Sequence, residues 1–466
     1  MNALLHVFDS TKKAVTTAKR LLWRFTATDA VCVTILLLVA MLLRFPFIGH
    51  PEVTQYDEVT YANYAMHMIE GKPFVDIHPP LARMLFAEVA RTAEPFKTTG
   101  LDMTFNQPPG DFPLTSEHNF IALLGTLLPL IVYVIARLLL YTPRVALLLG
   151  LFVASDNALI IFSRVMLPDM PLFFFAFLSL MFGLLSLRAQ KRHSSAYTLL
   201  AAMSIGCAIS IKWTGLGVLL SLLFMYLLHR RYVAIVFTVA IAALVYVSIC
   251  ILMLFTYFPS GGMTSNLANE SDATKLWVAH LQFPKLDSVG TAVKFLTPLH
   301  AAMMKGNTDP ELVSAILKSQ GAYSWPIARN RMVFWHDNAS GKSVIASGND
   351  VLWIMSFFAF IFDVFWILAW VAKRKKPPMS KHELFLLFGY SVNFLPFFFI
   401  ERPMYLYHYF IALIFLILLL PKVMPRIVHC LKETSGDELF AQTFVVIGTI
   451  LIFVNVFFTF PLTYGY

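Results

Sequence analysis

Two short motifs near the start of the chain carry side chains that could do acid–base chemistry. They are YDE at 56–58 and DIHPPL at 76–81. A carboxylate held against a hydroxyl can take its proton, so Asp57 is a candidate general base and Glu58 a candidate for orienting Asp57 or an acceptor. Structural roles stay open, because Asp57 precedes a helical pattern as an N-cap does and His78 suits a turn hydrogen bond.

Three cations lie at the ends of apolar segments and predict a site for phosphate: Arg164, Lys212 and Arg402. A cation at membrane depth is costly unless it is paired or functional. Arginine binds phosphate through a planar fork and lysine as a point charge, while snorkelling to the interface is the alternative. Asp156 and Asp169 flank Arg164 along the chain, where they either hold that arginine or contact substrate.

The composition excludes an ordinary soluble domain. Of 466 residues, 58% are hydrophobic and 14% are charged, against roughly 25% charged in soluble domains. Lipid must therefore be the solvent, and the backbone must satisfy its own hydrogen bonds as helices or a closed barrel. The apolar runs are helix-length and do not alternate, so we predict an all-α integral membrane protein.

We expect eleven transmembrane spans. They are 29–49, 119–141, 145–162, 168–187, 196–211, 214–228, 232–256, 351–372, 383–400, 404–421 and 440–460. The first 28 residues are basic and precede a full-length span, which indicates a retained anchor rather than a cleaved signal peptide. Asp363 lies within the eighth span with no partner assigned.

The positive-inside rule places the N-terminus in the cytoplasm. In that orientation the cytoplasmic segments carry 20 Lys and Arg with 6 Asp and Glu, and the opposite side carries 15 and 20. The net charge of +9 is therefore a signal of topology, and no nucleic-acid partner is predicted. The C-terminus and both long loops then lie outside.

The spans divide the chain into four predicted parts. A basic N-terminus (1–28) precedes spans one to seven (29–256), whose outer loop 50–118 carries the candidate catalytic residues. A second outer loop (257–350) and spans eight to eleven (351–466) follow. Within the first loop, 58–70 and 80–92 have one apolar face each and are too short to span, which predicts helices on the membrane surface or on the bundle.

The motifs together resemble the protein O-mannosyltransferase family. The resemblance rests on YDEVTYANYAMHMIEGKPFVDIHPPL at 56–81, SDNAL with SR and LPD over 155–169, IKWTG at 211–215, and Arg402 with YLYHYF at 405–410. It extends over essentially the whole chain. The first segment is the most specific part.

The resemblance implies a GT-C fold and transfer of mannose from a polyprenyl (dolichyl-like) phosphate to Ser or Thr hydroxyls of proteins. It implies a β-linked donor and an α-mannoside product, as one base acting in a direct displacement would give. No cofactor and no metal are expected, and pairing with a second copy or a homologue stays open. Further substrate-site candidates are Asp76, His78, His118, Asp156, Asp169, Trp213, Tyr407 and His408.

The chain departs from the family pattern at three places. Thr60 stands where the family usually has His, and EHN at 117–119 replaces a segment that usually carries an arginine. Either the role of that arginine is absent here or it passes to His118. Loop 257–350 is too short for the β-trefoil (MIR) domain of eukaryotic members. We therefore expect a MIR-less, prokaryote-like member, in the plasma membrane of a prokaryote or the endoplasmic reticulum of a eukaryote.

Two other functions remain open. A transferase of the same fold could glycosylate a lipid or polysaccharide instead of a protein, which an acceptor assay would distinguish. A transporter or flippase is less consistent with the sequence, because transporters show inverted repeats and broken helices at the midplane. Here no internal repeat is visible and the charges gather at one face.

Overall fold

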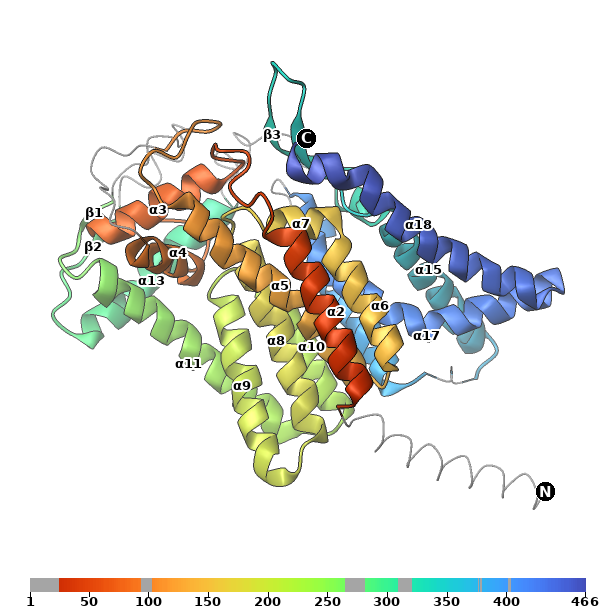
Figure 1. Cartoon of the computed structure of the whole chain (residues 1–466). Helices are drawn as coiled ribbons and strands as arrows, with labels where there is room; N and C mark the ends of the chain where they lie inside the picture. The colour runs from red at the N-terminus through yellow and green to blue at the C-terminus, as the bar shows by residue number, and fades with distance from the viewer. Residues whose placement is uncertain are drawn as a thin grey trace.

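The computed structural model is a bundle of helices with small additions at one end (Figure 1). It describes residues 25–93, 103–264, 281–308, 321–375, 377, 379–400 and 404–466. In this part of the chain, seven helical segments are long and apolar enough to cross a membrane. They are α2 (Ala27–Arg44), α5 (Leu114–Leu138), α8 (Asp169–Arg188), α11 (Tyr232–Tyr257), α15 (Asp350–Ala372), α17 (Phe410–Ser435) with the preceding 3₁₀ turn η3 (Leu406–Tyr409), and α18 (Glu438–Tyr464).

Four further helices fill the other predicted spans: α6 (Pro143–Ser155), α9 (Lys191–Ile209), α10 (Gly215–Leu228) and α16 (Lys381–Phe394). An all-α protein that crosses the membrane several times is thus confirmed, while the count of eleven crossings stays a prediction. The span expected over 145–162 is not one continuous helix. Asp156 interrupts it and starts the short helix α7 (Asn157–Phe162), because its carboxylate accepts a hydrogen bond from the Leu159 amide at 3.0 Å.

Apolar side chains face outward along several helices, as lipid contact requires. Val233 on α11 is 84% exposed and Phe457 on α18 is 78% exposed. By contrast, every residue of α17 from Phe410 to Leu420 is buried, so α17 is the central helix of its half of the bundle. Exposed apolar surface on this scale is stable only against lipid or another protein.

The segments between the spans form short helices and hairpins. The two helices predicted in the first long loop are confirmed as α3 (Glu58–Glu70) and α4 (Leu81–Thr92). The second long loop contains α13 (Val289–Thr308), the turn η1 (Ala322–Ile327), and the antiparallel hairpins β1–β2 (Gly262–Met263, Gln282–Phe283) and β3–β4 (Met332–His336, Ser343–Ala346), while the turn η2 (Leu395–Phe398) extends α16. In Figure 1, α3, α4 and β3–β4 lie with the C-terminus at the end of the bundle toward which α2 runs.

Asp363, which has no partner in the sequence pattern, belongs to a three-helix ion network. The Arg426 guanidinium on α17 contacts Asp363 on α15 at 2.5 Å and also pairs with Glu383 on α16. The Cζ atom of Arg426 lies 4.0 Å from the centre of the Trp366 ring. One arginine therefore neutralises carboxylates from two neighbouring helices and fixes the three helices against each other.

Removing Arg426 should destabilise the bundle, because two buried carboxylates lose their partner. We expect Arg426→Ala to lower the free energy of unfolding by about 3 kcal/mol, measured by thermal unfolding in detergent. Arg231→Ala, at an exposed site, is the matched control. Replacing Arg426, Asp363 and Glu383 together by leucine should recover most of the loss. Equal stability of Arg426→Ala and the control would contradict this role.

Candidate active site

Asp57 occupies the N-cap position of α3, but its carboxylate does not cap the helix. The Asp57 carbonyl accepts from the Thr60 and Tyr61 amides, while the side chain makes no capping hydrogen bond. The preceding residue, Tyr56, has a left-handed backbone (φ 46°), and its amide donates to the carbonyl of Phe334 on β3. The turn therefore holds Asp57 in place and leaves its carboxylate for other contacts.

The Asp57 side chain is exposed to solvent, yet its pKa is raised. Desolvation by the surrounding protein atoms raises the pKa of Asp57 to about 6. The positive charge of Lys212 partly offsets this rise in pKa, and the negative charge of Asp169 adds to it. A carboxylate of this kind is ionised at neutral pH and is a stronger base than an ordinary aspartate.

Glu58 differs from the adjacent Asp57 in burial and in hydrogen bonding. It is fully buried, and its carboxylate accepts from the Met166 amide at 2.8 Å, the Gln55 amide at 2.7 Å and His118 Nε2 at 2.5 Å. These partners belong to three separate segments. Both carboxylate oxygens are therefore used to tie the Asp57 turn to the bundle.

His118 lies between two acceptors. Its Nε2 faces Glu58 and its Nδ1 faces the carbonyl of Ile48 at 3.1 Å. Through these two contacts His118 joins the Glu58 carboxylate to the segment that follows α2. That His118 takes the role of the family arginine stays a prediction.

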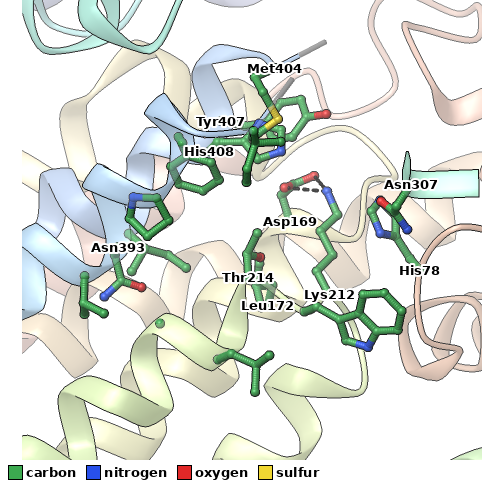
Figure 2. A pocket seen from close by; sticks show the side chains of 18 of the residues that line it. His78, Asp169, Leu172, Lys212, Thr214, Asn307, Asn393, Met404, Tyr407 and His408 are labelled. Atoms are coloured by element: carbon green, nitrogen blue, oxygen red, sulfur yellow. Dashed lines mark hydrogen bonds and ion pairs between the residues drawn. The ribbon is translucent and has the colours of Figure 1, made fainter. Parts of the chain in front are cut away.

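Lys212 and Asp169 form a buried ion pair. Lys212 Nζ contacts the two carboxylate oxygens of Asp169 at 2.8 and 2.9 Å, and it lies 4.7 Å from the centre of the Tyr407 ring. Asp169 is the first residue of α8, and Lys212 lies in the turn between α9 and α10. Three elements therefore meet at this pair (Figure 2).

The ion pair lines a pocket of about 470 Å³ that is mostly apolar. Its walls come from α8, α10, α16 and the η3 turn, with α13 and the second motif at one side. The lining residues are His78, Asp169, Leu172, Phe173, Lys212, Trp213, Thr214, Leu216, Gly217, Leu220, Met304, Asn307, Thr308, Val392, Asn393, Pro396, Phe397, Ile400, Met404, Tyr407, His408 and Ile411. Of the candidates, His78, Asp169, Lys212, Trp213, Tyr407 and His408 are thus brought together. Asp57 does not line the pocket, but its carboxylate interacts electrostatically with Lys212 and Asp169.

Within the second motif, His78 and Asp76 have different surroundings. Asp76 is buried and forms an ion pair with Arg83 on α4, and Arg83 also donates to the His78 carbonyl at 2.8 Å. Asn307 of α13 donates to the Ile77 carbonyl at 2.8 Å. The Asp76 carboxylate is therefore committed to holding the turn, and His78 is the member of the motif that lines the pocket.

Two other candidates lie outside the pocket. The Arg164 guanidinium donates to the carbonyls of Arg44, Pro46 and Phe47 at 2.6–2.7 Å, so it caps the end of α2. Asp156 accepts from the Trp353 indole at 2.7 Å and the Asn349 amide at 2.9 Å, and does not pair with Arg164. Neither is among the residues that line the pocket with Lys212. Arg402 lies outside the described residues.

Some pocket residues were not predicted from the sequence. Asn393 is a polar residue within an apolar span, which was an available signal, whereas Asn307 and Met404 lie in irregular or surface segments without one. Over the described ranges, no cluster of three or more His, Cys, Asp or Glu side chains could hold a metal ion.

Two sequence models of one family match most of the chain. The model described as "Dolichyl-phosphate-mannose-protein mannosyltransferase" matches residues 32–259, and "C-terminal four TMM region of protein-O-mannosyltransferase" matches residues 292–466. The chain belongs to the protein O-mannosyltransferase family. This family of glycosyltransferases is the one that the motifs at 56–81 and 405–410 resemble.

Curated family members match over part of their length. Dolichyl-phosphate-mannose–protein mannosyltransferase 1 of Schizosaccharomyces pombe is 31% identical over 40% of this chain and 21% of its own length. The Saccharomyces cerevisiae protein of the same name is 31% identical over 41% of this chain and 24% of its own length. The matched region thus spans about a fifth to a quarter of these relatives.

Solved structures confirm the GT-C fold. The S. cerevisiae protein O-mannosyltransferase Pmt1–Pmt2 complex bound to the sugar donor superposes with a TM-score of 0.78, at 16% identity, over 97% of this chain and 92% of that one. The oligosaccharyltransferase of Archaeoglobus fulgidus superposes with a TM-score of 0.52, at 12% identity, over 95% of this chain and 56% of that one. At these identities the likeness concerns the fold alone.

Variants of Lys212 should affect donor binding, whereas a variant of Arg164 should affect stability. We expect Lys212→Gln combined with Asp169→Asn, which removes both charges of the pair, to weaken binding of a polyprenyl-phosphate-sugar by about 1.5–3 kcal/mol, as loss of a charge-assisted hydrogen bond does. Arg164→Ala should lower the unfolding temperature and leave that affinity unchanged in the folded fraction. Binding to purified protein in detergent and thermal unfolding measure the two effects. The reverse pattern would return the phosphate role to Arg164.

Proposed function

We propose that this family member transfers mannose from a polyprenyl-phosphate donor to Ser or Thr hydroxyls of proteins on the non-cytoplasmic membrane face. One observation carries the proposal. Asp57 has an exposed carboxylate that caps no helix and interacts electrostatically with Lys212, which lines an apolar pocket. A lipid-borne donor and a water-borne acceptor could meet there.

The pocket chemistry suits a lipid phosphate. Its walls of Leu172, Phe173, Leu220 and Ile411 offer apolar surface to an isoprenoid chain without a hydrogen-bonding requirement. The Lys212 ammonium has three N–H donors, and Asp169 accepts from it with both carboxylate oxygens. A remaining N–H can then bind a phosphate oxygen, while Asp169 keeps the empty site close to neutral.

The reaction needs one base and no covalent intermediate. The acceptor oxygen attacks the anomeric carbon while its proton passes to Asp57, and the bond from that carbon to the phosphate oxygen breaks. The lipid phosphate leaves with the bonding electron pair, and the lysine stabilises the charge that develops on it. Attack opposite the leaving group inverts the anomeric centre, so a β-linked donor gives an α-mannoside.

The acceptor class follows from the family and is tested directly. Purified protein is given polyprenyl-phosphate-mannose labelled in the sugar, together with a Ser/Thr-rich peptide, a lipid acceptor or a glycan acceptor. Label in the peptide fraction supports the proposal. Label only in the lipid or glycan fraction would assign the chain to a transferase of the same fold with another acceptor. Pairing with a second copy or a homologue stays a prediction.

Asp57→Asn should abolish most turnover while preserving the fold, because the amide keeps the shape but cannot accept the proton. We expect the rate to fall by about 10²–10⁴-fold, the usual contribution of a positioned base. Glu58→Gln should cost less activity and lower the unfolding temperature, since it loosens the turn. Glu52→Gln, an exposed carboxylate in the same loop, is the control.

The pH dependence gives a second measurement on Asp57. Since the base must be ionised, turnover should fall tenfold per pH unit below the pKa of about 6 and be flat above it. The residual activity of Asp57→Asn should lack this acid limb. A folded Asp57→Asn protein with near-normal turnover and an unchanged acid limb would defeat the mechanism.

A further inference from the structure

A chain of hydrogen bonds runs from the pocket wall to α13. Trp213 lines the pocket, and its indole Nε1 lies 3.1 Å from the hydroxyl of Tyr246 on α11. The same hydroxyl lies 2.7 Å from Nε2 of His300 on α13. His300 Nδ1 lies 2.7 Å from the Leu296 carbonyl. The chain thus joins the turn before α10, the α11 span and the outer helix α13.

The donors in this chain can be assigned from its two ends. The indole N–H can only donate, so the Tyr246 oxygen accepts from Trp213. The Leu296 carbonyl can only accept, so His300 Nδ1 carries a proton. In the neutral imidazole Nε2 is then an acceptor, and it receives the Tyr246 O–H. Each hydrogen bond in this relay, from Trp213 through Tyr246 and His300 to the Leu296 carbonyl, thus has one donor and one acceptor. The relay therefore holds the Trp213 ring in one orientation.

Trp213 is linked to α13 through the Tyr246 hydroxyl and the His300 imidazole. In Figure 2, Leu172 of α8 and Asn393 of α16 lie on one side of the Lys212–Asp169 pair, whereas His78 and Asn307 of α13 lie on the other. The link to α13 therefore associates Trp213 with the side of His78 and Asn307. If the phosphate binds Lys212 and the tail follows the apolar walls, the sugar falls on this second side. A flat aromatic face suits the C–H face of a sugar ring.

We propose that Trp213 is the platform for the donor's sugar and that Tyr246 and His300 are positioning residues that hold its ring in place. The inference rests on the proposed function and extends it to Tyr246 and His300, which lie outside the motifs. It also gives α13 a role, because this helix holds His300 of the relay and Asn307 of the pocket wall.

Two ligands separate a sugar contact from a general effect on the fold. Binding is measured on purified protein with polyprenyl-phosphate-mannose and with polyprenyl phosphate, which lacks the sugar. Each variant is compared with the unmodified protein for the same ligand, so the charge difference between the ligands cancels. Tyr232→Phe is the matched control, since Tyr232 lies on the same helix as Tyr246 and is 60% exposed.

We expect Tyr246→Phe to weaken binding of the mannose-bearing ligand by about fivefold, the effect of one lost hydrogen bond, and to leave binding of polyprenyl phosphate unchanged. Trp213→Leu should have a larger effect in the same direction. His300→Ala should match Tyr246→Phe, and His300→Gln should recover part of the loss because its carboxamide oxygen can accept from Tyr246.

Equal weakening of both ligands in these variants would overturn the sugar platform, as would a mannose-bearing ligand unaffected by Trp213→Leu. A different result would contradict the proposed function. If the unmodified protein transfers no mannose, yet Trp213→Leu still weakens only the mannose-bearing ligand, the platform stands and the transfer reaction does not.

Discussion

A charged side chain inside a bundle that faces lipid must find its partner within the protein, because neither lipid nor bulk water can solvate it. This constraint governs most ionisable groups of the described spans. Asp29 pairs with Arg137, Asp169 with Lys212, and Arg426 with two carboxylates. Arg164 has no carboxylate partner among the described residues, and its guanidinium instead donates hydrogen bonds to three backbone carbonyls. These contacts fix the helices around the pocket.

The same constraint separates structural from chemical roles at the site. Glu58 and Asp76 carry the formal features of catalytic carboxylates, but their oxygens are committed to amides, an imidazole or a guanidinium. Asp57 is adjacent to Glu58 and has neither a capping bond nor full burial. The turn is therefore built so that one carboxylate holds it and the next stays available for proton transfer.

Local patterns in the sequence predicted the elements but not their partners. The apolar periodicity of 58–70 and 80–92 sufficed to predict α3 and α4, because it reports a helix with one buried face. Arg164 and Lys212 share one local signature, a cation at the end of an apolar run. Their roles differ because the Arg164 fork reaches carbonyls distant in sequence while Lys212 reaches Asp169, and such pairings depend on tertiary structure. The break at Asp156 was missed for the same reason, since Trp353 and Asn349 hold that carboxylate.

In the proposed reaction one base, Asp57, serves a direct displacement, and the anomeric configuration of the product distinguishes this from a covalent mechanism. Purified protein is incubated with β-linked polyprenyl-phosphate-mannose and a Ser/Thr peptide, and the configuration of the new bond is read by NMR. We expect the α-mannoside alone, because a single displacement inverts the centre. A β-mannoside would show two successive displacements through a covalent intermediate, and would contradict Asp57 as a simple proton acceptor.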